Sequence, residues 1–173
     1  MERIKINRIT NANVYVDGTS FLGKVEECKL PEVKMLMSAH KALGMVGNVE
    51  FPSGVEKLEA TFKWNSLYPD VLAKAANPYT AVELQVRSSM ETYGNGGRLA
   101  QTSVVAYLTG TFTKFPFGGF KQHENVDAET TMSVTYCKLE IGGRAVIEFD
   151  ALANIFKADG VDLLETYKTN IGG

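Results

Sequence analysis

Apolar and polar residues alternate along much of the chain, and this period of two is typical of β-strands with one buried face. Residues 58–64 show it clearly, because Leu58, Ala60, Phe62 and Trp64 alternate with glutamate, threonine and lysine. Long stretches of the same kind follow in the second half of the chain. The pattern predicts a mainly β protein built on an antiparallel sheet.

Turn-forming residues divide the alternating segments into hairpins. Residues 13–30 contain a strand, an Asp-Gly pair and a second strand, which is a strong local hairpin signal. Residues 102–141 predict a long hairpin, and its two strands of roughly 12 residues each extend about 40 Å. A Gly-Gly pair then leads into a further short strand at residues 144–150.

Only residues 67–77 carry a convincing helical pattern. Pro69 and Asp70 suit the first turn of a helix, and an Asn-Pro pair predicts its end. A shorter helical turn is expected within residues 161–170. We therefore predict a single domain over residues 1–173, mainly β (α+β), with an antiparallel β-sandwich or barrel-like fold and one flanking α-helix.

Residues 33–50 fit neither period, because they are apolar and methionine-rich and contain two glycines, Gly44 and Gly47. One interpretation is a helix or loop that covers the core. The other is a protruding inter-subunit loop, since flexible methionine-rich surfaces suit protein contacts. The candidate contact residues of this loop are Met35, Leu36, Met37, His40, Leu43 and Met45.

The composition is that of an ordinary soluble globular protein, with 45% hydrophobic and 22% charged residues. A formal charge of −2 leaves no basic footprint, so stable sequence-specific nucleic-acid binding is not expected. Cys28 and Cys137 belong to no CxxC pair and are expected to be buried free thiols. No apolar run reaches the roughly 18 residues of a membrane span, and the charged opening lacks a signal-peptide core. A protein made in a cytoplasm is predicted.

Candidate chemistry is confined to the acidic residues between positions 138 and 162. The segment around Asp159 lacks the alternating oxygen ligands of a calcium loop. Asp159-Gly160 is therefore interpreted as a turn, and Asp162 as the N-cap of a helical turn. There is no GxSxG motif and there are only two histidines, so neither a nucleophile triad nor a zinc site is predicted. No enzyme activity, metal or cofactor is expected.

The two ends of the chain carry a more specific pattern. The opening has an asparagine, an Asp-Gly hairpin turn, a glycine and a Leu-Pro pair, at Asn11, Asp17, Gly18, Gly23, Leu30 and Pro31. The ending has a longer ordered set, at Tyr136, Leu139, Gly143, Arg144, Glu148, Asp150, Asn154, Gly160, Val161, Asp162, Leu164, Ile171 and Gly172. In order and spacing, these residues resemble the major tail tube proteins of contractile-tailed bacteriophages and of R-type pyocins.

The resemblance implies a structural subunit of the inner tail tube. Such subunits form hexameric rings that stack into a hollow conduit, with long strands of neighbouring subunits joined around the lumen. The implied partners are further copies of the chain, the tail sheath protein, baseplate and tail terminator proteins, and the tape measure protein and transiting DNA within the lumen. The implied location is the virion tail, after assembly in the cytoplasm of the bacterial host.

The resemblance also implies that exposed residues line the lumen or contact other subunits. Hydroxyls with a small acidic excess would expose few cations to a sliding polyanion, so the polar strand faces are candidates for lining the lumen. Glu148 and Asp150 share a strand face and are expected to pair with a basic residue across a subunit joint. The loop at residues 33–50 is expected to contact the next ring. The lumen candidates are Lys57, Glu59, Thr61, Lys63, Ser103, Thr109, Thr111, Thr113, Asp127, Glu129, Thr131, Ser133 and Thr135.

Three other interpretations stay open. A tube protein of a type VI secretion system, or of another contractile injection system, would share the fold class. A small-ligand-binding β-barrel would be a monomer with an apolar internal pocket. An enzyme would use the acidic stretch near the C-terminus, and it would lose activity on Asp150→Asn without losing assembly.

Overall fold

The computed structural model describes residues 4–172, so residues 1–3 and 173, the ends of the predicted domain, lie outside the described part. The strands of the main sheet are β1 (Ile6–Val16), β2 (Thr19–Ser20), β3 (Val25–Lys29), β6 (Leu58–Trp64), β7 (Val82–Gly94), β8 (Gly97–Lys114), β9 (Ala128–Ile141), β10 (Arg144–Asp150), β11 (Ile155–Ala158) and β12 (Val161–Asp162). The remaining elements are β4 (Met35–His40), β5 (Val49–Val55), α1 (Pro69–Ala75) and α2 (Glu165–Asn170).

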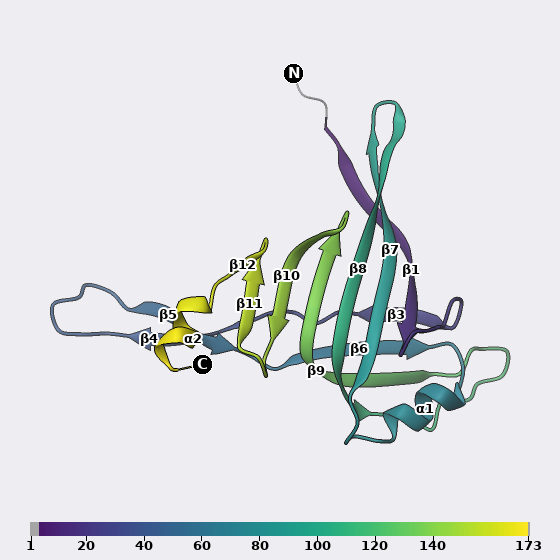
Figure 1. Ribbon diagram of the computed structural model, residues 1–173. Helices are drawn as coiled ribbons and strands as arrows, with labels where there is room; N and C mark the ends of the chain where they lie inside the picture. The colour runs from purple at the N-terminus through teal and green to yellow at the C-terminus, as the bar shows by residue number, and fades with distance from the viewer. Residues whose placement is uncertain (1–3, 173) are drawn as a thin grey trace.

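The main sheet has ten antiparallel strands, and its long path runs β12-β11-β10-β9-β8-β7-β1-β2 (Figure 1). Strand β9 is shared between two parts of it, because its first half pairs with β6 as well as β8, and its second half pairs with β8 and β10. As a result, β6 and β3 run across β7 and β8 in Figure 1, and the sheet curls around its apolar face. The predicted mainly β, barrel-like fold is confirmed.

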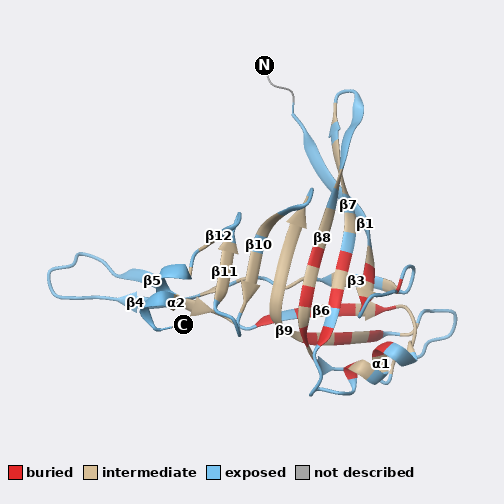
Figure 2. Cartoon of the chain, viewed as in Figure 1, coloured by how far each residue is buried: buried red, intermediate tan, exposed pale blue. Residues whose placement is uncertain are grey.

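The hydrophobic core fills the inside of this curled sheet (Figure 2). Leu58, Ala60, Phe62 and Trp64 of β6 are all buried, as their alternation predicted. They pack against buried residues of β1, β7, β8 and β9, of which Leu84, Phe112 and Met132 are among the largest. The interior is therefore occupied by large side chains, and the fold is held together by non-local strand pairing around them.

Two-residue turns close several of the hairpins. Asp17-Gly18 joins β1 to β2, and Asp159-Gly160 joins β11 to β12. All of these residues have positive φ angles, between 44° and 82°, as a type I′ turn requires at both central positions, and Asp-Gly is a favoured pair for it. The interpretation of Asp159-Gly160 as a turn is confirmed.

The two helices are short. Helix α1 lies within the predicted segment 67–77 and buries Val71 and Ala75 against the barrel. Helix α2 lies within residues 161–170, but Leu164, not Asp162, is its N-cap residue. The N-cap prediction for Asp162 was wrong by two positions, because this residue belongs to β12 and binds the backbone of Leu164 from there.

The hairpins differ in extent from the expectations. Strands β8 and β9 pair within residues 102–141, but β8 starts earlier, and its residues 97–110 pair with the whole of β7, forming a hairpin that was not predicted. The second strand of the 13–30 hairpin is reduced to the two residues of β2. Residues 33–50 form no helix; they contain β4, the loop at residues 41–48 and the start of β5, and so contribute to a separate two-stranded sheet, β4-β5.

Candidate assembly surfaces

The β4-β5 hairpin, which we call the arm (residues 35–55), projects away from the barrel in Figure 1. Its strands bond only to each other as a ladder, and residues 41–48 form its tip. Leu43 and Val46 at the tip are fully exposed, at 106% and 108%. An isolated two-stranded hairpin is only marginally stable in water, and a protruding apolar tip marks a contact surface.

The arm contains the predicted contact residues of its segment. Leu36, Met37 and Met45 are exposed like Leu43, and His40 is exposed with its ring centroid 6.2 Å from that of Phe51 on β5. Met35 differs, because it is half-buried at the base of the arm. The structure thus gathers this part of the predicted contact set on one projecting element.

The second surface is the polar side of the main sheet, which we call the polar face. Strand pairing brings the lumen candidates of β6 and β9 into register: Glu59 lies opposite Ser133, Thr61 opposite Thr131, and Lys63 opposite Glu129. Thr111 of β8 in turn lies opposite Ser133. Residues from three strands far apart in the sequence therefore form one continuous surface, on the side of the sheet opposite the core.

The other lumen candidates extend or flank this surface. Thr109 and Thr113 alternate with the buried residues of β8, and Thr135 sits in the bulge where its hydroxyl donates to the Thr109 carbonyl, at 3.2 Å. Lys57 and Asp127 precede β6 and β9. Ser103 is exposed farther along β8, opposite Ser89 of β7.

Part of the polar face was missed by the sequence interpretation. Gln85 and Arg87 of β7, Tyr107 of β8, and Lys138 and Glu140 of β9 lie on the same side of the sheet. The Arg87 guanidinium lies 5.0 Å from the Tyr15 ring centroid, and the Lys138 ammonium 4.7 Å from that of Tyr107. The alternation in VELQVR at residues 82–87 was the signal that could have found β7.

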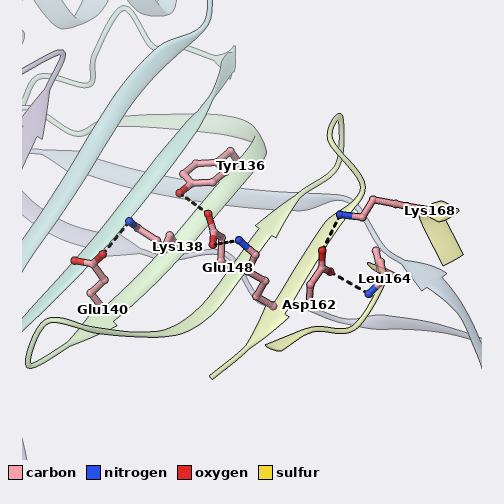
Figure 3. Close-up of polar contacts among 8 residues, drawn as sticks. Tyr136, Lys138, Glu140, Glu148, Asp162, Leu164 and Lys168 are labelled. Carbon is pink, nitrogen blue, oxygen red and sulfur yellow. Dashed lines mark hydrogen bonds and ion pairs between the residues drawn. The ribbon is translucent and has the colours of Figure 1, made fainter. Parts of the chain in front are cut away.

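Lysines of the polar face, together with Lys168 of α2, are paired with carboxylates of the same chain. Figure 3 shows a row of contacts on β9, β10, β11, β12 and α2. Each of these ammonium groups lies within 4 Å of a carboxylate oxygen, so its positive charge is largely compensated locally. The pairs are Lys57–Glu59 (2.8 Å), Lys63–Glu26 (3.8 Å), Lys114–Glu129 (2.8 Å), Lys138–Glu140 (2.8 Å), Lys157–Glu148 (3.3 Å) and Lys168–Asp162 (2.7 Å).

Glu148 and Asp150 also have partners inside the subunit. The Tyr136 hydroxyl donates to Glu148 at 3.2 Å, and burial, together with the Glu148 charge, raises the pKa of Tyr136. Asp150 accepts the backbone amides of Leu152 and Ala153, at 2.9 and 3.0 Å, which closes the turn after β10. Pairing of these two carboxylates across a subunit joint stays a prediction.

Asp162 also forms its hydrogen bonds within the subunit. Its carboxylate accepts the Lys168 ammonium at 2.7 Å and the Leu164 amide at 3.0 Å, and these two bonds lower the pKa of Asp162. The carboxylates of the acidic stretch thus serve pairing and turn geometry. Within residues 4–172, no group of three or more His, Cys, Asp or Glu side chains is arranged to hold a metal ion. No described helix combines the length and apolarity that crossing a membrane requires.

A curled antiparallel sheet, with a polar face whose lysines are paired with carboxylates and with a projecting apolar arm, defines a mainly β structural subunit. The family described as "Phage tail tube protein FII" matches residues 6–172. The chain belongs to this family, whose members are structural proteins of the virion tail.

Two curated relatives have the same character. The "Tail tube protein" of Escherichia phage P2 is 26% identical over 164 residues, covering 92% of this chain and 94% of that protein. The "Major tail tube protein" of Serratia phage KSP20 is 27% identical over 152 residues, covering 87% and 86%. Because both alignments extend over most of each chain, the resemblance inferred from the sequence ends is confirmed.

Proposed function

We propose that this protein forms the inner tube of a contractile tail, as hexameric rings that stack into a hollow conduit for DNA. The observation that carries the proposal is the family match over residues 6–172. Its physical support is that a long, open sheet edge invites pairing with another chain. When subunits pair head to tail and the rotation from one subunit to the next adds up to a full circle, the edges are closed into a ring.

The polar face is the part of the subunit suited to line the lumen. A polyanion slides past hydroxyls and compensated charges with little retention, because retention grows with the number of phosphate contacts that free cations make. The partners in this arrangement are the tail sheath outside the tube, and the baseplate and tail terminator proteins at its ends. The tape measure protein and then DNA occupy the lumen.

The arm is suited to the contact between successive rings, since it extends beyond the barrel and exposes an apolar tip. Replacing Leu36 and Leu43 with aspartate places two charges on this surface while leaving the core untouched. We expect the double variant to fold but to form no tubes by negative-stain electron microscopy, under conditions where the wild type forms them.

A matched control keeps the number of added charges but moves them off the arm. Ala73 on α1 and Ala76, the C-cap residue directly after it, are exposed and are suitable sites for two aspartates. Tubes of normal length from the Leu36→Asp, Leu43→Asp variant would contradict the role of the arm. Wild-type protein that yields no rings or tubes at any concentration would contradict the proposed function itself.

A further inference from the structure

A large apolar groove lies where the base of the arm meets the C-terminal segment. It has a volume of about 640 Å³ and is lined from both sides. Met35 and Val55 come from the arm, Phe149 and Phe156 from β10 and β11, and Leu163 and Tyr167 from the segment around α2. Leu163 and Tyr167 are more than half exposed, at 56% and 53%. Such an exposed apolar hollow is typical of a contact site.

The arm tip has the complementary form. Leu43, Met45 and Val46 protrude at the end of the hairpin and have the aliphatic character that the groove lining favours. The tip segment also carries Lys41 and no carboxylate between residues 40 and 48. Among the described residues that line the groove, Asp150 is acidic and none is basic. The two surfaces are thus complementary in both apolar character and charge.

A chain cannot fill its own groove with its own tip. Strands β4 and β5 form one wall of the groove, and six residues of β4 carry the tip about 20 Å away from that wall. Figure 1 shows the tip directed away from α2 and the barrel. The tip is therefore available only to another molecule.

We infer that the groove receives the arm tip of a second copy of this chain, with Lys41 of one copy facing Asp150 of the next. This inference rests on the proposed function, and it adds the acceptor surface to the ring-to-ring contact. Because the tip and the groove are different surfaces, the contact is heterologous and repeats from copy to copy. The occupant thus comes from this chain alone and needs no other protein.

Disulfide trapping tests this contact in assembled tubes. In a Cys28→Ala, Cys137→Ala background, Val46→Cys places a thiol on the tip and Ala151→Cys places one beside the groove. Both positions are exposed. After mild oxidation, we expect a ladder of covalently linked subunits on non-reducing gels, and none from either single-cysteine variant. Val46→Cys combined with Ala73→Cys on α1 is the matched control, and it should not produce the ladder.

The outcomes separate the inference from the proposed function. Tubes that form but give no ladder, or a ladder as strong from the Ala73→Cys control, overturn the inference and leave the tube assignment standing. Wild-type protein that forms no tubes overturns both.

If the cysteine variants fail to assemble, a mixing experiment tests the contact between tip and groove. Leu43→Asp disables the tip, and Leu163→Asp disables the groove. Each variant alone should stop at single rings. A mixture should give pairs of rings, with twice the mass in mass photometry, because an intact tip then meets an intact groove. A mixture that stays at single rings contradicts the inference.

Discussion

Gly110 lies at a close approach between strands β8 and β9. A Cβ atom at this position would lie 2.0 Å from the backbone carbonyl oxygen of Ser133, far inside van der Waals contact. The adjoining bulge between Thr109 and Gly110 changes the register of the β8-β9 ladder. A residue without a side chain is therefore required at the point where β9 passes from one part of the sheet to the other.

We expect Gly110→Ala to destabilise the subunit by about 1–3 kcal/mol or more, as overpacking against backbone does. Urea denaturation of a non-assembling variant measures the change. Gly96→Ala is the matched control, because nothing lies within 4 Å of its added Cβ, and its effect should stay within about 0.5 kcal/mol. Equal stability of the two variants would show that β8 and β9 can separate without loss.

Cys137 gives a second residue-scale expectation. Both cysteines are free and half-buried rather than fully buried, and desolvation raises the pKa of Cys137 from 9.0 to about 11. In a Cys28→Ala variant at pH 8, the fraction of Cys137 present as thiolate should be about 100-fold lower in the folded than in the unfolded chain. The rate of its reaction with Ellman's reagent should be lower by the same factor, because the thiolate is the reacting form.

The rate should rise about tenfold per pH unit toward pH 11. Because the folded state keeps this proton longer than the unfolded state, the thiol also lowers stability as pH rises from 9 toward 11. A native rate at pH 8 equal to that in guanidinium would contradict the effect of burial.

At the scale of elements, β9 is central to the fold because it pairs with β6, β8 and β10. A buried polar contact lies where it pairs with β6. The indole Nε1 of Trp64 donates to the hydroxyl of Thr130 at 3.0 Å, and Thr130 is fully buried. Removing the acceptor leaves an N–H group without a partner inside the core, and such a group costs about 1–3 kcal/mol.

We expect Thr130→Val to lose that stability, and Thr130→Ser to retain most of it. The serine keeps the hydroxyl although it loses a methyl group, whereas valine keeps the volume and loses the acceptor. Denaturation followed by the fluorescence of Trp64, the single tryptophan, measures both. A valine variant as stable as the serine variant would show that the indole needs no partner.

The elements differ in how far the sequence reveals them. The alternation in β6 is regular because one face is fully buried, so its inward residues could be read directly. The arm lacks such a pattern, since nothing in the same chain covers either of its faces, and its pairing contains a bulge between Leu36 and Met37. The groove joins residues from positions 35 to 167, and no local period connects them.

At the scale of the whole molecule, the charges of the polar face matter as a set. Glu140→Gln and Glu148→Gln together would leave Lys138 and Lys157 without their carboxylates. In the non-assembling Leu36→Asp, Leu43→Asp background, we expect several-fold tighter binding of a short DNA duplex at low salt, measured by fluorescence anisotropy.

The control for this prediction is Asp17→Asn with Asp159→Asn, which changes the net charge equally but removes the partners of Lys74 and Arg144 instead. Both of these carboxylates lie in turns outside the strands of the polar face. DNA binding that rises equally in both double variants would mean that net charge, and not local pairing on this face, governs retention.

Arm tips seated in grooves, as inferred above, would also give an assembled particle a direction. A stack held by tips seated in grooves leaves unoccupied protrusions at one end and empty hollows at the other. The two ends then present different surfaces, so a protein that stops growth at one end cannot recognise the other by the same contacts. An initiating complex that supplies only tips or only grooves allows elongation in one direction. That direction is determined by the placement of the tip and the groove on each subunit.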